Sequence, residues 1–349
     1  MTAPLRIGIA GLGRLGWRHA QNLARRVNGA LLAAACSPLE AERERARTGL
    51  GLPASAIYGD LDAMLDGAKL DAVVLVTPTA VHAQQTLAVL RRGLHVFVEK
   101  PLALNVADCE AVVRESTALA QQHPGQVALV GFVRRFDPSY ATAMDTVRAG
   151  GIGMPFFVRS QTCDRLDPSG FFVQFAPSSG GIFLDCSVHD IDLARWFLSE
   201  GGTAPRATRV YATGVRAIHH DLAPIGDVDN GMALIEFEGG RRAALYASRT
   251  HAHGHETHTE VLGSAGQLLI GQGAARDRVV LSDAHGVRHQ AVQDFFERFE
   301  TAFERELQAF TDACRGLIAP PLSLSDALEA TRIGVALRQS LETGAPVDL

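Results

Sequence analysis

Short runs of consecutive apolar residues recur along the first third of the chain, separated by stretches with helical spacing. The runs lie at Leu5–Ala10, Ala30–Cys36, Asp71–Val76, Leu94–Val98 and Val127–Val130. Continuous apolarity over a few residues is typical of a parallel strand that is covered on both faces. The intervening helices are predicted at residues 14–26, 38–48, 79–92 and 105–121. This alternation predicts a doubly wound parallel sheet with right-handed crossovers.

Beyond about residue 125 the pattern changes to many strands with few helices between them. Strands are predicted at residues 153–162, 207–216, 230–237, 242–249, 258–263, 267–270 and 277–281. Helices are predicted at residues 138–149, 183–199, 295–316 and 323–342. We therefore expect an α/β protein with a Rossmann domain over residues 1–125 and a second α/β domain over residues 126–349. The second domain should contain a large, open, mostly antiparallel sheet, and the helix at 323–342 should pack near the Rossmann domain.

Composition narrows the class of protein. The 349 residues include 33 basic and 38 acidic ones, a net charge of -5, without long blocks of like charge. This balance argues against nucleic-acid binding, which needs concentrated Lys and Arg. No apolar run approaches the roughly 20 residues of a membrane span, and the N-terminus leads almost at once into a predicted strand, so we expect neither membrane insertion nor a signal peptide. The five scattered cysteines are typical of reduced thiols, which favours a cytoplasmic location.

A glycine-rich loop, Gly11-Leu12-Gly13-Arg14-Leu15-Gly16, directly follows the first predicted strand and opens the first helix. In this position the three glycines provide a tight turn, close backbone approach to a pyrophosphate, and close packing of helix on strand. The helix N-terminus adds unpaired N–H groups for the phosphates. The loop therefore predicts a dinucleotide cofactor.

The residue that binds the adenosine ribose should lie about 20 positions further on, at the end of the second strand. The sequence there is Ala35-Cys36-Ser37-Pro38, without a carboxylate that would repel a 2′-phosphate. Ser37 can hydrogen-bond either a ribose hydroxyl or a phosphate. The sequence therefore leaves NAD and NADP as alternatives.

Two further motifs carry groups suited to acid–base chemistry. Glu99-Lys100-Pro101 follows the fifth strand, and open α/β sheets place their chemistry at this end of a strand. A partly buried Lys100 could exchange a proton with a substrate hydroxyl. Within the predicted helix at 183–199, Asp185, His189 and Asp192 share one face, so a carboxylate can orient an imidazole. A surface lysine and a solvated polar stripe are the structural alternatives.

These motifs, together with Thr77-Pro78-Thr79 and His82, occur in an order and spacing that resembles the Gfo/Idh/MocA oxidoreductases. The resemblance extends over nearly the whole chain. It includes Gly131–Asp137 and Glu260–Gly266, and within the family these stretches are most similar to those of the inositol 2-dehydrogenases.

The resemblance implies an NAD- or NADP-dependent dehydrogenase that oxidises a ring hydroxyl of a polyol or sugar to a ketone. It implies a catalytic triad of Lys100, Asp185 and His189, in which His189 takes the hydroxyl proton. It also implies a homo-oligomer, a tetramer or a dimer, assembled through one face of the second sheet. The cofactor-binding residues that it implies, besides the glycine loop and Ser37, are Thr77, Pro78, His82, Glu99 and Lys100. The substrate-binding residues that it implies, besides the triad, are Arg135, Thr162, Asp164 and His255.

Two departures from the family pattern concern the substrate. His253-Gly254-His255-Glu256 stands where inositol dehydrogenases often have Tyr-Gly-Tyr-Asp, and Thr162 and Asp164 stand where a His and an Asn are expected. An aldose dehydrogenase, a glycosidase that uses bound NAD, and a catalytically silent sensor are therefore kept as alternatives to an inositol dehydrogenase.

The histidines of residues 251–258 raise the separate hypothesis of a metal site. On a strand, His251, His253 and His255 would share one face with a spacing able to hold zinc. The order His255-Glu256-Thr257-His258 does not match the H-E-x-x-H motif, and we predict no functional metal here.

Overall fold

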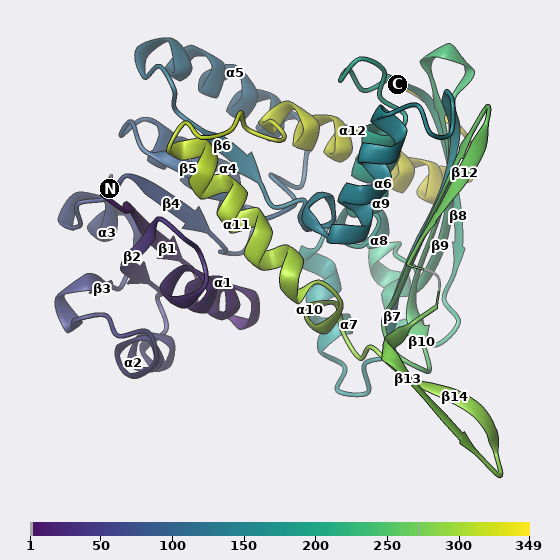
Figure 1. Ribbon diagram of the computed structural model, residues 1–349, viewed down its shortest axis with the longest axis horizontal. Coiled ribbons are helices and arrows are strands. Elements are labelled where there is room, and N and C mark those ends of the chain that lie inside the picture. Colours follow the sequence, from purple (N-terminus) through teal and green to yellow (C-terminus); the bar gives the residue numbers. More distant parts are fainter. Residues whose placement is uncertain (1–2, 272) are drawn as a thin grey trace. The chain divides into compact units, whose positions relative to one another are not determined.

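The computed structural model describes residues 3–271 and 273–349, which form two compact units (Figure 1). The first unit contains the chain up to Phe136 and the segment Thr301–Thr331. The second contains Asp137–Glu300 and Arg332–Leu349. A segment near the C-terminus thus returns to the first unit.

The first unit is built on a six-stranded sheet with the order β3-β2-β1-β4-β5-β6, in which every pairing is parallel. Its strands are β1 (Leu5–Ala10), β2 (Ala30–Cys36), β3 (Ile57–Tyr58), β4 (Ala72–Leu75), β5 (His95–Val98) and β6 (Ala128–Val130). The strand order reverses between β1 and β4, which is where doubly wound sheets place their ligands. The predicted doubly wound sheet is confirmed.

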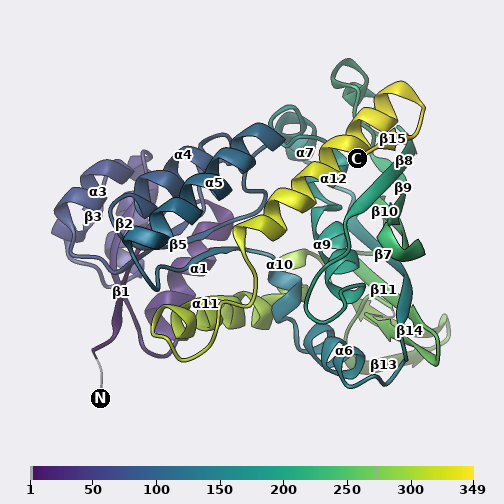
Figure 2. The ribbon, with the colours of Figure 1, turned by 90° about the horizontal axis from the view of Figure 1, so that it is seen from above.

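Helices cover both faces of this sheet. They are α1 (Arg14–Arg25), α2 (Glu40–Gly49), α3 (Leu61–Gly67), α4 (Thr79–Leu90), α5 (Val106–Gln122) and α11 (Glu300–Cys314). In Figure 2, α4 and α5 lie on one side, and α1 and α11 lie on the other. The ring of Phe310 on α11 meets Phe97 of β5 edge-on, with the centroids 5.8 Å apart, so α11 is packed against the strand that precedes Lys100.

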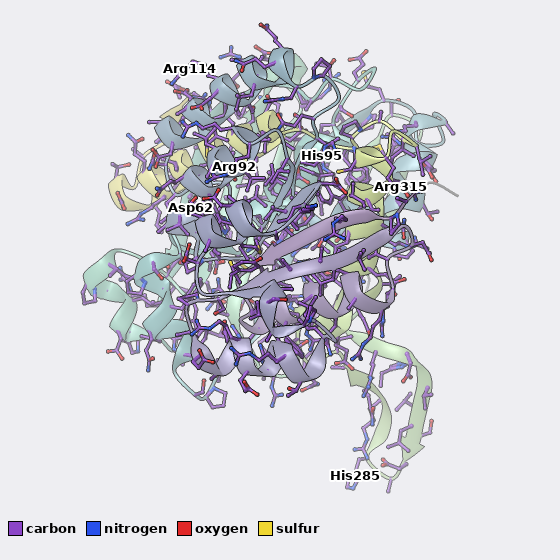
Figure 3. The ribbon with its side chains drawn as sticks, turned by 90° about the vertical axis from the view of Figure 1, so that its left-hand side faces the viewer. Asp62, Arg92, His95, Arg114, His285 and Arg315 are labelled. Atoms are coloured by element: carbon purple, nitrogen blue, oxygen red, sulfur yellow. The ribbon has the colours of Figure 1, made fainter. Side chains whose placement is uncertain are left out.

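The second unit contains a seven-stranded sheet with the order β12-β11-β7-β10-β9-β8-β15. Its strands are β7 (Pro155–Arg165), β8 (Ala207–Val215), β9 (Asn230–Phe237), β10 (Arg242–His251), β11 (Glu256–Gly263), β12 (Gly266–Ile270) and β15 (Val347–Asp348). The pairing of β7 with β10 is parallel and the others are antiparallel, as predicted for a mostly antiparallel sheet. A separate hairpin joins β13 (Ala275–Asp283) to β14 (Gly286–Ala291), and His285 lies in its turn (Figure 3).

One face of the seven-stranded sheet is covered by α6 (Pro138–Arg148), α8 (Ile182–Asp185) and α9 (Val188–Phe197) (Figure 1). Residues along β9 alternate between this buried face and an outer face. The buried face includes a polar layer, in which the hydroxyls of Ser160 and Thr162 each donate to the Asp190 carboxylate at 2.6 Å. Because Asp190 is fully buried, these bonds replace the water that it loses on folding.

Two predicted helices are interrupted. The helix expected at 183–199 is divided at Cys186 and Ser187, where the Ser187 N–H bonds Ile182 across five residues instead of four. Asp185 is therefore the last residue of α8, while His189 is the second residue of α9. The helix expected at 295–316 is divided at Phe299 into α10 (Phe295–Arg298) and α11.

The cysteines and the helices bear on the predicted thiols and on membrane insertion. None of the five cysteines, which all lie in the described ranges, forms a disulfide, and all but Cys314 are buried. Of the helices in the described part of the chain, none combines the length and the apolarity needed to cross a membrane.

Candidate active site

The glycine loop lies between β1 and α1, at the reversal of the strand order. A side chain at Gly11, where φ is +89°, would place its Cβ 2.3 Å from the Val76 carbonyl oxygen, and a Cβ at Gly16 would lie 2.0 Å from the Gly11 oxygen. Both positions therefore require glycine. Gly13 differs, because among the described residues only Glu42 Oε1 would come within 4 Å of a Cβ added there, at 3.9 Å. The space before Gly13 and the α1 N-terminus thus suits a dinucleotide pyrophosphate.

The rest of the loop is anchored from α2. Leu12 is buried, and its carbonyl oxygen accepts a hydrogen bond from the Arg45 guanidinium, which also stacks on Trp17 at 4.2 Å. Arg14 and Leu15 form the first turn of α1, where Arg14 is exposed and Leu15 is half-buried. The loop is therefore held in place without any ligand.

Ser37, at the end of β2, is paired with a carboxylate that the sequence analysis missed. The buried Ser37 hydroxyl donates to Glu42 Oε2 at 2.6 Å. The Arg43 guanidinium donates to the Ser37 carbonyl oxygen at 2.7 Å and also pairs with Glu40. Glu42 is five residues beyond Ser37 on α2, so only the packing of α2 brings its charge to the predicted ribose site.

His82 joins the two loops that follow β4 and β5. Its Nε2 lies 2.7 Å from the Thr77 carbonyl oxygen and its Nδ1 lies 2.9 Å from the Pro101 carbonyl oxygen. Burial lowers the pKa of His82, while the two carbonyl contacts act in the opposite direction. Pro78 directly precedes α4. Through its two contacts, His82 connects the Thr77-Pro78 turn to the Glu99-Lys100-Pro101 loop.

Lys100 follows β5 and is half-buried. The neighbouring Glu99 is buried; its Oε2 accepts from the Lys100 backbone N–H at 3.1 Å, and its Oε1 lies 2.8 Å from His19 Nε2. The Glu99 carboxylate thus points into the interior of the unit.

In the second unit, Arg249 holds two of the predicted site residues together. Its guanidinium donates to Asp185 at the end of α8 and to Asp164 Oδ2 at 2.9 Å. Asp164 Oδ1 lies 2.9 Å from Nδ1 of the buried His255. The Arg249 guanidinium also stacks on Phe172 at 4.4 Å. Three predicted residues from α8, β7 and the segment before β11 thus meet around one cation that the sequence analysis did not select.

The acidic side chains of this cluster stabilise the charge of Arg249. The Arg249 side chain is 13% exposed, and those of Asp164 and Asp185 are 28% and 16% exposed. Burial alone would lower the pKa of Arg249, but the negative charge of Asp185 and its acidic neighbours raises the pKa above its ordinary value. The guanidinium therefore remains charged between the two carboxyl groups. A signal for Arg249 exists in the sequence, since it ends a predicted strand of small and apolar residues.

The remaining predicted residues have separate surroundings. His189 is half-buried in the first turn of α9. The buried Thr162 hydroxyl donates to Asp190, on the face of the sheet that carries the helices. Arg135 belongs to the first unit, where its Nη2 lies 3.6 Å from Asp326. Their roles in binding substrate stay predictions.

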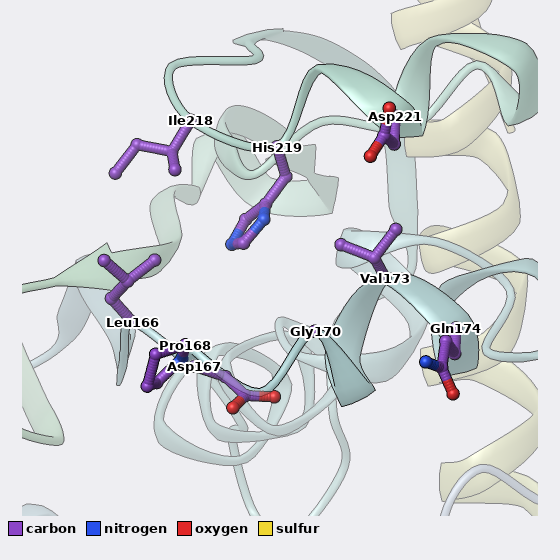
Figure 4. A pocket seen from close by; sticks show the side chains of 9 residues that line it. All are labelled: Leu166, Asp167, Pro168, Gly170, Val173, Gln174, Ile218, His219 and Asp221. Atoms are coloured by element: carbon purple, nitrogen blue, oxygen red, sulfur yellow. The ribbon is translucent and has the colours of Figure 1, made fainter.

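A cavity of about 500 Å³ lies beside the Arg249 cluster (Figure 4). The His219 ring points into it and meets Phe172 edge-on at 5.4 Å, and Phe172 in turn contacts Arg249. Three backbone N–H groups donate to Asp229 at 2.7–2.8 Å and hold the His219 segment. The cavity is lined by Leu166, Asp167, Pro168, Gly170, Val173, Gln174, Ile218, His219 and Asp221.

The hypothesis that places His251, His253 and His255 on one face of a strand is wrong. β10 ends at His251 and β11 begins at Glu256, and the chain bends between them at Gly254, where φ is +143°. His255 is therefore directed to Asp164 instead of sharing a face with the other two histidines. A different group, His251, His253 and Glu256, has one ligand atom each within 4.8 Å, but the His253 side chain is 54% exposed.

Two family models match the chain. The oxidoreductase family with an NAD-binding Rossmann fold covers residues 5–128, and the GFO/IDH/MocA C-terminal domain covers residues 140–269. The scyllo-inositol 2-dehydrogenase (NAD(+)) of Bacillus subtilis is 35% identical over 100% of this chain and 97% of that protein. The myo-inositol 2-dehydrogenase of Thermotoga maritima is 31% identical over 99% of this chain and 98% of that protein.

A solved structure agrees with these matches. The scyllo-inositol dehydrogenase of Lactobacillus casei, with bound NAD(H) and scyllo-inositol, has a TM-score of 0.91 and is 36% identical, over 99% of both chains. The agreement extends over both units and confirms the resemblance seen in the sequence. The chain therefore belongs to the Gfo/Idh/MocA family of oxidoreductases, with an NAD-binding Rossmann domain.

Proposed function

We propose that this protein is an NAD-dependent dehydrogenase that oxidises one ring hydroxyl of an inositol to a ketone. The observation that carries the proposal is the cluster of Asp185, Asp164 and His255 around Arg249. Such a cluster offers several fixed acceptors and an imidazole to a ligand rich in hydroxyl groups. The full-length relatives named as inositol dehydrogenases support the same substrate class.

The proposed chemistry divides the work among the triad. His189 takes the hydroxyl proton while the C–H bond breaks and the C=O bond forms. Asp185 stabilises the imidazolium that results, and Lys100 polarises the oxygen. When bound at the glycine loop, the nicotinamide cofactor supplies the acceptor for the hydrogen that leaves carbon with its electron pair. The pairing with Arg249 fixes the position of the Asp185 carboxyl group, as this role needs.

A spectrophotometric screen tests the function. The purified protein is mixed with NAD⁺ or NADP⁺ and with myo-, scyllo- and chiro-inositol or a set of aldoses, and the reduced nicotinamide is measured. We expect turnover with an inositol and NAD⁺. Turnover with aldoses alone would replace the substrate class, and a protein that stays silent with bound cofactor would favour the glycosidase or sensor alternatives.

The triad makes a first prediction. Lys100→Ala or His189→Ala should abolish inositol turnover and leave NAD⁺ affinity, measured by calorimetry, nearly unchanged. This separation is expected because each side chain acts on the reacting hydroxyl, while the glycine loop holds the pyrophosphate. A loss of NAD⁺ affinity in proportion to the loss of turnover would contradict the assigned roles.

The ion pairs of Arg249 with Asp185 and Asp164, which we call the Arg249 clamp, make a second prediction. Arg249→Met should lower kcat/KM for inositol by about a hundredfold or more, because two partly buried carboxylates lose their cation and Asp185 loses its fixed position. Arg249→Lys should be intermediate, since it keeps the charge without the two-pronged geometry. Arg241→Met, which breaks an ion pair to the exposed Glu200, is the matched control and should behave as wild type. Full activity in Arg249→Met would refute the clamp.

Glu42 favours NAD over NADP in this proposal. Its carboxylate lies beside Ser37 at the end of β2, where it would repel a 2′-phosphate. Glu42→Gln should therefore raise the ratio of kcat/KM for NADP⁺ to that for NAD⁺ by about tenfold, which equals about 1.4 kcal/mol. Glu44→Gln, at an exposed ion pair with Arg47 on the same helix, is the control. An unchanged ratio would show that Glu42 does not determine cofactor choice.

The outer face of the seven-stranded sheet supports a homo-oligomer. Tyr211, Met232 and Leu234 are 38%, 57% and 55% exposed and lie side by side on β8 and β9. Arg159 and Glu260 form an ion pair on the same sheet, so an apolar centre borders paired charges, as in interfaces between protein chains. We assign this face to a second copy of the chain, because such a face can be self-complementary about a two-fold axis.

The assignment makes a further prediction. Light scattering should give a dimer or tetramer for the wild type and a smaller species for Leu234→Glu, which buries two like charges near the axis. Val279→Glu, on the exposed hairpin strand β13, is the control and should not alter the mass. A monomeric wild-type protein would contradict the assignment.

A further inference from the structure

A buried cluster of three titratable side chains lies next to the Lys100 backbone in the first unit. His19 comes from α1, Glu99 follows β5, and Glu306 comes from α11. His19 and Glu306 are completely buried, and the Glu99 side chain is 7% exposed. The His19 ring is packed edge-on against Phe97 and Phe303, with centroids 5.7 and 5.6 Å away. No part of the proposed reaction uses His19 or Glu306.

The contacts within the cluster are unequal. His19 Nε2 lies 2.8 Å from Glu99 Oε1 but 3.8 Å from Glu306 Oε1. The second Glu99 oxygen accepts from the Lys100 backbone N–H at 3.1 Å. Among the described residues, neither oxygen of Glu306 has a hydrogen-bond partner. The His19 imidazole therefore hydrogen-bonds Glu99. Glu306 lies close enough to compete with Glu99 for this hydrogen bond.

The cluster is more stable when one of its two carboxyl groups carries a proton. Two ionised carboxylates and one imidazole in an apolar surrounding would be costly, because each charge loses its hydration. Burial and the nearby charge of Glu99 raise the pKa of Glu306 well above its ordinary value. A neutral Glu306 leaves Glu99 as the one anion, with two hydrogen-bond donors directed at it. An ionised Glu306 would attract the imidazole proton away from Glu99.

We propose that Glu306 is a positioning residue that remains protonated, so that His19 stays bonded to Glu99 and Glu99 holds the Lys100 backbone in place. This inference rests on the proposed function of Lys100. The space for Glu99 is provided by Gly131, where a Cβ would come within 3.0 Å of the Glu99 carboxyl atoms. The hydrogen bond from His19 and the space at Gly131 thus define one position for the Glu99 carboxylate. The proton on Glu306 preserves this hydrogen bond.

Infrared difference spectroscopy tests the proton directly. The spectrum of wild type minus Glu306→Gln, recorded near neutral pH, should contain the carbonyl band of a protonated carboxylic acid. Glu304→Gln, on the exposed side of the same helix, is the matched control and should remove only a carboxylate band. A carboxylate band in place of the acid band for Glu306 would overturn the proposal.

Thermal stability gives a second readout that does not need activity. In the unfolded chain Glu306 ionises above its ordinary pKa of 4.5, whereas in the folded protein it stays protonated, so wild-type stability falls as pH rises above this value. Glu306→Gln removes this loss. Its Tm relative to wild type should therefore increase from about pH 5 to about pH 9, while that of Glu304→Gln should not. A difference in Tm that is independent of pH would count against the proton.

Kinetics tests the positioning of Lys100. Glu306→Gln should retain wild-type kcat for inositol near neutral pH, because the amide is also neutral, and the alkaline limb of its kcat profile should move upward by about one pH unit. An unmoved limb would leave Glu306 with a structural role only and overturn the positioning claim.

If the wild type oxidises no inositol, the proposed function fails, while the infrared band and the Tm still decide the protonation state. A stoichiometric divalent metal in the purified protein, found by elemental analysis and lost in Glu306→Gln, would also overturn the proposal, because both carboxylates would then be ligands.

Discussion

The guanidinium of Arg249 is the cation on which the candidate site of the second unit depends. It lies near the end of β10 and reaches Asp185 on α8 and Asp164 on β7, so one side chain links three elements that are far apart in sequence. Without it, two anionic carboxylates would repel each other in a poorly hydrated place. The arrangement fixes the carboxyl group of Asp185 at the end of α8. These two ion pairs therefore hold the three elements together.

In the first unit, two buried histidines hold the loops near the predicted cofactor site in place. His82 connects the turns that follow β4 and β5, and His19 holds the Glu99 carboxylate beside the Lys100 backbone. Both rings are buried, so their orientation is determined by packing and by the groups they bond. The carboxyl ends of the parallel strands thus carry loops that are preorganised before any cofactor or substrate arrives.

Local patterns in the sequence predicted the elements well and the partners of individual side chains poorly. The limits of β1, β2 and β9 agree with the predicted strands, because continuous or alternating apolarity is a local signal. The break between α8 and α9 was missed, since Cys186 and Ser187 carry no proline or glycine to mark it. The contacts of Glu42, Arg249 and Glu306 could not be predicted because only tertiary packing brings their partners close. The loop pattern predicts close approach of a phosphate at Gly13, and the open surroundings of Gly13 agree with that prediction.

Transfer of hydrogen from a ring carbon is the central claim, and isotopic labelling measures it most directly. Inositol with deuterium on its ring carbons is incubated with the purified protein and NAD⁺, and the products are examined by mass spectrometry and NMR. We predict slower turnover than with unlabelled inositol, a ketone product, and one deuterium per turnover in the reduced cofactor. Deuterium released to water, or a product formed without net reduction of NAD⁺, would contradict the claim.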